Sequence, residues 1–179
     1  MSDHHGTVSG ATILTADGIY FNFEAPTEGF SLNAIARGLA NTCRFGGQCD
    51  RFYSVAEHSI HVSRIVPEHM AIIGLLHDAA EAFVGDMPKP LKELLPDFKA
   101  VERRIEAALF RAFGLPEDLP GEIKHADRAM LATEQRQLMQ NRDHWKWTGQ
   151  AVPLEIELEC WLPQRAYEAF VARAKELGL

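Results

Sequence analysis

The sequence predicts an all-α fold, a compact bundle of six or seven helices preceded by a small N-terminal β-hairpin. Apolar residues recur at helical spacing from Ser31 to the end of the chain, whereas an earlier stretch surrounds an Asp-Gly pair that is typical of a hairpin turn. Apolar residues make up 46% of the chain and charged residues 24%, which is ordinary for a globular domain. We therefore expect one domain spanning residues 1–179, with residues 1–10 flexible.

The first third of the chain contains the hairpin, one helix and a loop. Residues 11–23, ATILTADGIYFNF, predict two short strands. Ser31 is expected to cap a helix that runs to about Asn41 and has one apolar face. Residues 43–53, CRFGGQCDRFY, contain paired glycines and are expected to form a loop.

The remaining chain predicts five more helices. Ser54 begins the first, which runs to about Val66, and Ser54-Val-Ala-Glu57 fits a capping box that gives Glu57 a structural role. The other four are expected over about Pro67 to Gly85, Pro96 to Phe113, Gly121 to Arg142 and Pro163 to Gly178.

Charge and cysteine content exclude several classes of partner. The formal net charge is −7, which argues against a nucleic-acid polymer but still allows a small anion held by local Lys and Arg residues. Three unpaired cysteines argue against a disulfide framework and favour a cytoplasmic protein. No apolar run reaches the roughly 20 residues that cross a bilayer, so no membrane association is expected.

The segment AIIGLLHDAAEAFV, residues 71–84, is apolar or glycine except for three titratable residues, His77, Asp78 and Glu81. A helix that is apolar on all sides is normally buried, and burying an unpaired charge costs several kcal/mol or more. His77 and Asp78 can lean toward one point, and Glu81 lies about one turn away on the same face. This pattern fits a metal site with a carboxylate placed to act on a metal-bound water; the alternative is a buried His-Asp pair satisfied by the backbone.

Further metal ligands would have to come from neighbouring helices. His58 and Asp127 are candidates if three helices pack side by side and each directs one residue inward. Each is a weak signal alone, because a histidine can lie in a helix interface and an aspartate on a solvated face. His61 and His125 are rival ligands nearby.

Three segments together resemble the HD-domain metal phosphohydrolases, whose signature is H…HD…D. They are SVAEHS (54–59), LLHDAAEAFVGDMPKPLK (75–92) and KHADRAML (124–131). The resemblance is strongest to small bacterial 5′-deoxynucleotidases and to phage dATP triphosphohydrolases, and it extends from about Arg44 to Leu138. It implies an HD-domain helical bundle with four metal ligands: His58, His77, Asp78 and Asp127.

The resemblance also implies roles around that metal. Glu81 would position or deprotonate the attacking water, and Asp86 would support it or the leaving sugar oxygen. Arg44 would hold phosphate and Phe45 would lie beside the sugar or base, although Arg51 competes with Arg44 because loop lengths differ there.

Two lysines near the proline turn are further candidates for substrate contacts, because phosphoryl transfer needs positive charge near the phosphoryl oxygens. Lys89 and Lys92 would neutralise phosphate charge; the alternative is that both are solvated charges. Relatives often have tryptophan at the position of Phe45 and a small hydroxyl residue at that of Lys89, so sugar and base preference stay open.

The resemblance implies hydrolysis of the 5′-phosphoester of a nucleotide, preferably a deoxynucleotide, by a metal-activated water. A monophosphate would give deoxynucleoside and phosphate, and a triphosphate would give deoxynucleoside and triphosphate. The cofactor would be one divalent ion per chain, cobalt, manganese, zinc or iron, with magnesium accompanying a triphosphate.

Gly46 and Gly47 supply no side-chain wall, which predicts loose base selectivity, and the phage resemblance mildly favours adenine. The resemblance also implies a homo-oligomer, a dimer or hexamer.

Two other functions stay open from the sequence. One is a phosphodiesterase or signalling-nucleotide hydrolase that uses the same metal centre. The other is a catalytically silent metal-binding module, which Glu81 and Asp86 argue against because a pure binder needs neither. We interpret Trp145 and Trp147 as packing or interface residues rather than a nucleobase site.

Overall fold

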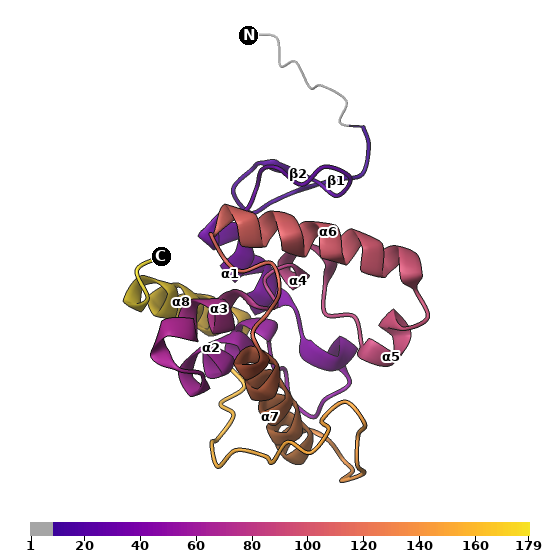
Figure 1. Cartoon of the computed structure of the whole chain (residues 1–179), viewed down its shortest axis with the longest axis vertical. Coiled ribbons are helices and arrows are strands. Elements are labelled where there is room, and N and C mark those ends of the chain that lie inside the picture. Colours follow the sequence, from indigo (N-terminus) through magenta and orange to yellow (C-terminus); the bar gives the residue numbers. More distant parts are fainter. Residues whose placement is uncertain (1–8) are drawn as a thin grey trace.

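The computed structural model describes residues 9–179 and confirms a mostly helical fold with a small N-terminal hairpin (Figure 1). The prediction that residues 1–10 are flexible falls mainly on residues 1–8, which lie outside the described part. Two strands pair antiparallel, β1 (Thr12–Leu14) and β2 (Tyr20–Asn22). The helices are α1 (Leu32–Asn41), α2 (Val55–Ile65), α3 (Ala71–Leu76), α4 (Glu81–Val84), α5 (Lys89–Lys92), α6 (Pro96–Ala112), α7 (Gly121–Leu138) and α8 (Pro163–Glu176), with short 3-10 turns η1 (Arg44–Gly47) and η2 (Glu68–Met70).

The hairpin is attached to the helices through one buried aromatic residue. Phe21 on β2 is fully buried and stacks on Phe83 of α4, with ring centroids 4.2 Å apart. Phe23 and Phe30 meet the Phe21 ring edge-on. Such aromatic contacts add to the free energy gained from burial, so the hairpin docks on the bundle rather than standing free.

The two predicted serine caps are confirmed. The Ser31 hydroxyl accepts a hydrogen bond from the Ala34 backbone N–H at 2.9 Å, and Ser54 accepts one from the Glu57 N–H at 3.1 Å. The second half of the capping box is wrong, because the Glu57 carboxylate accepts from two backbone N–H groups before α8, those of Cys160 and Trp161. Glu57 is therefore structural, but it fixes the entry to α8 instead of closing its own helix.

Two helices differ from their predicted bounds. The helix expected over 67–85 is interrupted between α3 and α4, where i→i+3 hydrogen bonds such as Glu81 N–H to the Asp78 carbonyl tighten the backbone. If α3 and α4 count as two halves of one helix, residues 9–179 contain seven. The helix expected to reach Arg142 ends at Leu138, because Met139 adopts an extended conformation.

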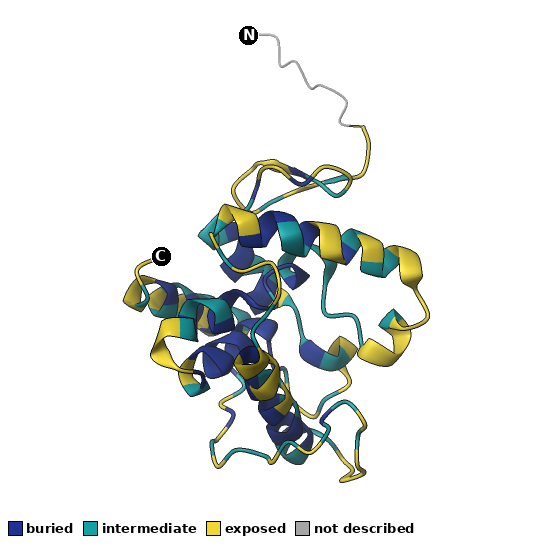
Figure 2. Cartoon of the chain, viewed as in Figure 1, coloured by how far each residue is buried: buried dark blue, intermediate teal, exposed yellow. Residues whose placement is uncertain are grey.

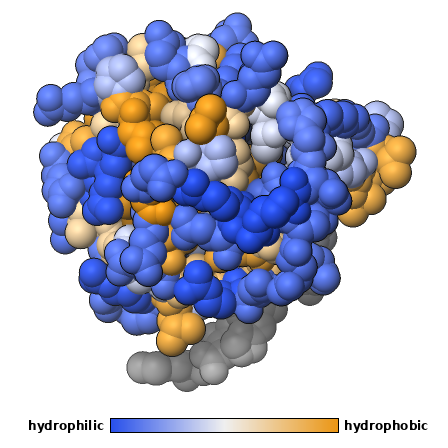
Figure 3. Space-filling view, turned by 90° about the horizontal axis from the view of Figure 1, so that it is seen from below, coloured by the Kyte–Doolittle hydropathy of each residue, from blue (hydrophilic) through white to orange (hydrophobic). Residues whose placement is uncertain are grey.

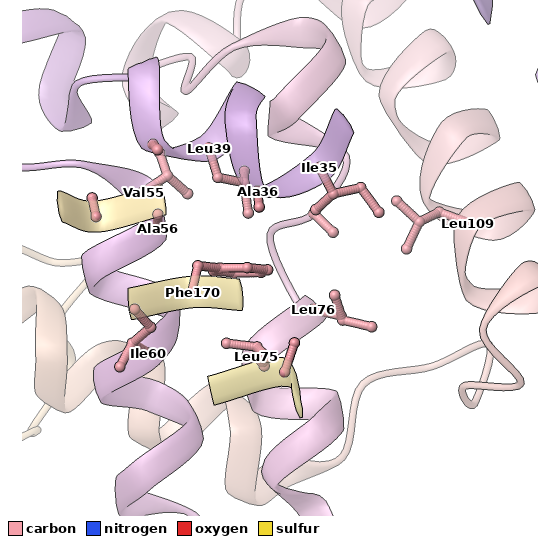
Figure 4. Close-up of a cluster of buried hydrophobic side chains, with 14 of the residues drawn as sticks. Ile35, Ala36, Leu39, Val55, Ala56, Ile60, Leu75, Leu76, Leu109 and Phe170 are labelled. Carbon is pink, nitrogen blue, oxygen red and sulfur yellow. The ribbon is translucent and has the colours of Figure 1, made fainter. Parts of the chain in front are cut away.

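The largest core cluster lies between α1, α2, α3 and α8, with Leu109 of α6 at its edge (Figure 4). Phe170 of α8 lies against the apolar faces of α1 and α2. Every residue from Val55 to Ser63 on α2 is buried, and Figure 2 shows this helix surrounded by the others. Polar residues on α2 are thus held in a rigid, largely dry setting.

The face seen from below in Figure 3 is mostly hydrophilic, with separate apolar areas. Among the described residues, no helix combines the length and apolar character needed to cross a membrane.

Candidate metal centre and substrate cavity

Four side chains from three parts of the fold meet at one point inside the protein. They are His58 from α2, His77 and Asp78 from the turn after α3, and Asp127 from α7, and one ligand atom from each lies within 4.8 Å of the others. His58 Nε2 is 3.3 Å from His77 Nε2 and 3.3 Å from Asp127 Oδ1. His77 Nε2 is 3.2 Å from Asp78 Oδ2. The structure therefore brings together the four residues that the resemblance proposed as ligands.

Both imidazoles are held so that the Nε2 atoms face the centre. The Nδ1–H of His77 donates to the Gly74 carbonyl at 2.8 Å, and the Nδ1–H of His58 donates to Glu134 Oε1 at 2.6 Å. A neutral imidazole with a proton on Nδ1 has a lone pair on Nε2. Two such lone pairs 3.3 Å apart beside two carboxylates repel one another unless a cation lies among them. The residues can therefore hold a divalent metal ion, and imidazole with carboxylate suits zinc, cobalt, manganese or iron.

The protonation behaviour of the cluster follows the same logic. Burial and the Arg44 guanidinium lower the pKa of His58, but Glu134 and Asp127 outweigh them and raise this pKa to about 9. Burial by itself raises the pKa of Asp78, yet His77 and its other cationic neighbours hold this pKa well below its ordinary value. The cluster thus favours positive charge at its centre, either as a proton on an imidazole or as a bound cation.

Glu134 on α7 connects the cluster to Arg44. Its carboxylate is fully buried; Oε1 accepts from His58, and Oε2 accepts from Arg44 Nε at 3.1 Å. Arg44 also approaches Asp78 Oδ2 at 3.6 Å. A carboxylate behind a ligand imidazole fixes the tautomer and the ring orientation of that ligand.

Glu81, the first residue of α4, is not one of the four clustered residues, but it lines the cavity that Asp78 and Asp127 also line. Its side chain is buried, and Oε2 has no hydrogen-bond partner among residues 9–179. Burial raises the pKa of Glu81 well above its ordinary value, and the nearby Asp78 and Asp86 add to the shift. A buried carboxyl with a free oxygen and a raised pKa is a typical proton donor or acceptor.

Asp86 holds the loop that contains Phe45. Its Oδ2 accepts from the Phe45 backbone N–H at 2.9 Å. Phe45 has φ 58°, a left-handed conformation that is rarely adopted by an aromatic residue and often marks a functional site. In the described structure, Asp86 is therefore a support for η1 in addition to any role in catalysis.

The cluster adjoins a cavity of about 700 Å³. Asp78 and Asp127 form part of its wall, and five cationic side chains surround it: Arg44, Lys89, Lys92, Lys124 and Arg128. Lys92 is bound to Glu102 at 2.5 Å and half-buried, so it is not a freely solvated charge, whereas Lys89 is exposed. All four residues predicted for substrate binding line the cavity.

The rival residues lie elsewhere. His61 packs against Trp161, with ring centroids 6.4 Å apart, and its Nε2 is 3.8 Å from Glu57. His125 is exposed on the other side of α7, and Arg51 is exposed on the loop before α2. The geometry thus favours His58 over His61 and Arg44 over Arg51.

Comparison with known families agrees with this geometry. The family described as 5′-deoxynucleotidase YfbR-like matches residues 50–146. This match covers more than half of the chain and includes the four clustered residues. The chain belongs to the YfbR-like family. This confirms the resemblance seen in the sequence.

Three relatives of this YfbR-like chain show how far the similarity extends. Uncharacterized protein YfdR of Escherichia coli (strain K12) is 43% identical over 127 residues, which cover 70% of this chain and 71% of the relative. An uncharacterized protein of Rhodobacter capsulatus is 40% identical over 105 residues, 53% of this chain and 54% of the relative. A protein named 5′-deoxynucleotidase from Vibrio atlanticus (strain LGP32) is 32% identical over 71 residues, 31% of this chain and 37% of the relative.

Several residues of the YfbR-like site escaped prediction from sequence. Glu134 lies seven residues after Asp127, two turns along α7, and that spacing was the available signal. Lys124 and Arg128 lie close to Asp127 in the sequence, where they indicated only a solvated helix face; in the structure they line the cavity. Trp145 and Trp147, interpreted as packing or interface residues, line the cavity.

Proposed function

We propose that the chain is a divalent-metal-dependent phosphohydrolase that cleaves the 5′-phosphoester of deoxynucleotides. For a monophosphate the balance is deoxynucleoside 5′-phosphate plus water giving deoxynucleoside plus phosphate, with P–O cleavage. The observation that carries the proposal is the pair of inward-facing Nε2 atoms and two carboxylates beside a cavity that five cationic side chains line. Membership in a family described as 5′-deoxynucleotidases supports it.

His58, His77, Asp78 and Asp127 would hold the metal. When bound, a divalent ion lowers the pKa of a coordinated water and polarises a phosphoryl oxygen. Glu81 Oε2 would take the proton from the attacking water, and its lack of a partner among the described residues supports this role. Arg44, fixed by Glu134, and Lys89 would bind the phosphoryl oxygens and stabilise the charge that they carry in the transition state.

A triphosphate substrate is supported by a second observation. Lys124 and Arg128 lie four residues apart on α7 and add two cations to the same cavity beside Asp127. Such additional charge suits phosphate groups beyond the first. On this substrate the same bond would break, and the leaving product would be triphosphate.

The test is product analysis with metal-free protein reloaded with one ion at a time: zinc, cobalt, manganese, iron or magnesium. We expect dAMP to give deoxyadenosine and phosphate, and dATP to give deoxyadenosine and triphosphate. In Glu81→Gln we expect the rate to fall by roughly 100-fold or more while metal content stays unchanged. Glu122→Gln, at an exposed glutamate in the first turn of α7, is the matched control and should keep full activity.

The other outcomes identify the alternatives. Release of product from a cyclic or diester substrate, with none from dAMP or dATP, would assign the phosphodiesterase function. Stoichiometric metal binding without turnover of any nucleotide would assign the silent binding module. Either result would overturn the proposed reaction.

A further inference from the structure

The cavity also contains aromatic side chains that the proposed chemistry does not use. Phe45, Trp145 and Trp147 all line it. The Phe45 and Trp145 rings lie 6.2 Å apart between centroids at an interplanar angle of 62°, so they form a corner rather than a sandwich. The Trp147 indole N–H is buried without an acceptor among residues 9–179. The corner thus combines apolar faces with an unused donor nearby.

Trp145 belongs to the segment that follows α7, residues 139–162, and this segment is held in place. Gln135 on α7 donates through Nε2 to the Asp143 carbonyl at 2.6 Å. The Trp145 carbonyl accepts from the backbone N–H of Thr148 at 3.1 Å and from its hydroxyl at 2.7 Å, and the Thr148 side chain is buried. These bonds close a turn that fixes Trp145 at the cavity wall.

The same segment is also joined to the chain that follows α5. Lys146 Nζ lies 3.6 Å from Glu93 Oε2, just after α5, and its ammonium also lies 4.8 Å from the centre of the Trp147 ring. Figure 1 shows the orange segment after α7 returning below η1 and α5. On the other side of the corner, Asp86 fixes Phe45 through its backbone N–H. Both rings of the corner are thus positioned before any ligand arrives.

We propose that Trp145, together with Phe45, forms the surface on which the base of the substrate stacks, which makes Trp145 a specificity-determining residue. This inference rests on the proposed function for the presence of a nucleotide, and it replaces our interpretation of Trp145 as a packing residue. Every nucleobase has an apolar π face, so an aromatic corner accepts all bases. Purines present more area to stack, so they bind more tightly than pyrimidines. The unpaired N–H of Trp147 then finds an acceptor on the base.

The test uses the full metal-loaded chain and two kinds of measurement. One is KM for dAMP and for 2-deoxyribose 5-phosphate, which has the same phosphoester but no base. The other is calorimetric binding of deoxyadenosine, which has no phosphate to be cleaved and therefore reports stacking without turnover. The variants are Trp145→Ala, Trp145→Phe and, as a control, Tyr20→Ala on the exposed face of the hairpin.

We expect Trp145→Ala to raise the KM for dAMP and the Kd for deoxyadenosine by about 10- to 100-fold, as base–aromatic stacking predicts. It should change KM for 2-deoxyribose 5-phosphate by less than about twofold, and Trp145→Phe should recover most of the loss. Unchanged deoxyadenosine binding in Trp145→Ala, or no such binding by the natural chain, would overturn the inference. Equal losses with and without a base would assign Trp145 a structural role and overturn it as well.

Failure of the proposed function gives a different result. If the natural chain hydrolyses neither dAMP nor 2-deoxyribose 5-phosphate, the reaction is wrong. Loss of deoxyadenosine binding in Trp145→Ala would then still support the stacking surface.

Discussion

The site depends, residue by residue, on which nitrogen of each histidine is free. The Gly74 carbonyl accepts a hydrogen bond from the Nδ1–H of His77, and the Glu134 carboxylate accepts one from the Nδ1–H of His58. The Nε2 atom of His58 therefore faces Asp127, and that of His77 faces Asp78. A metal site of this kind is defined as much by the groups behind the ligands as by the ligands themselves.

Removing the group behind His58 should weaken metal binding. Glu134→Ala takes away the acceptor that orients His58 and leaves Arg44 without its buried partner. We expect metal affinity to fall by roughly 10- to 100-fold, measured by competition with a chelating dye. Glu134→Gln keeps an acceptor oxygen and should lose less, and Glu122→Ala, exposed on the same helix, should lose nothing. Equal affinity in Glu134→Ala and the natural chain would show that His58 needs no such support.

Sequence reasoning at the residue scale succeeded where a motif carried the information. The H…HD…D residues were found because their spacing in the chain resembles a known family. Glu134 was missed because a glutamate within a helix reads as solvent-exposed, and its burial depends on how α7 packs on α2. The position of Trp145 at the cavity was missed as well, because Trp145 belongs to a long segment of irregular backbone. No local periodicity predicts the course of such a segment.

Close packing between α1 and α4 sets the position of Glu81. Gly38 on α1 faces Ala82 on α4, and a Cβ added at Gly38 would lie 2.5 Å from the Ala82 carbonyl oxygen. Only glycine permits this approach, since the opposing atom belongs to the backbone and cannot swing away. The first turn of α4, which contains Glu81, is thereby kept against the bundle.

Gly38→Ala should therefore destabilise the fold. Alanine normally stabilises a helix interior by roughly 0.5–1 kcal/mol relative to glycine. Here the clash outweighs that gain, and we expect the free energy of unfolding to fall by about 1–3 kcal/mol in chemical denaturation. Gly121→Ala at the start of α7 is the control, because an added Cβ there meets no atom within 4 Å. A Gly38→Ala variant as stable as the control would contradict the packing described for α1 and α4.

The two helix starts with a serine cap were predictable, whereas helix α5, the break between α3 and α4, and the end of α7 were not. Ser31 and Ser54 cap their helices as expected because the signal is local: one hydroxyl accepts from one backbone N–H. The break between α3 and α4 leaves the apolar pattern of the segment intact, so periodicity alone does not reveal it. His77 and Asp78 both lie in this break.

Considered as a whole molecule, the chain is acidic, with a net charge of −7. Five of its cationic side chains nevertheless line one cavity, together with acidic residues of the candidate metal centre. An overall acidic surface disfavours nucleic-acid polymers while the local cations still attract a small phosphate. The single domain, the cytoplasmic location and the homo-oligomer stay predictions, since a single described chain does not test them.

The stability of the whole chain should reflect competition between protons and metal. The pKa of His58 in the folded metal-free chain is raised to about 9, above the ordinary value of 6.5. A raised pKa contributes stability that is complete below pH 6.5 and is lost as pH rises through 9. Metal binding requires the proton to leave, so it strengthens over the same range. The difference in melting temperature between metal-loaded and metal-free protein should therefore widen from pH 6.5 to pH 9, and a constant or narrowing difference would contradict the assignment.

The proposed reaction depends most on a cation shared by His58, His77, Asp78 and Asp127. The most direct measurement is anomalous X-ray scattering from crystals of the chain loaded with zinc, cobalt or manganese, collected at the absorption edge of that metal. We predict one peak per chain, surrounded by the two Nε2 atoms and by one carboxylate oxygen each from Asp78 and Asp127. A peak elsewhere, or no peak between these four side chains, would contradict the metal centre and the hydrolase built on it.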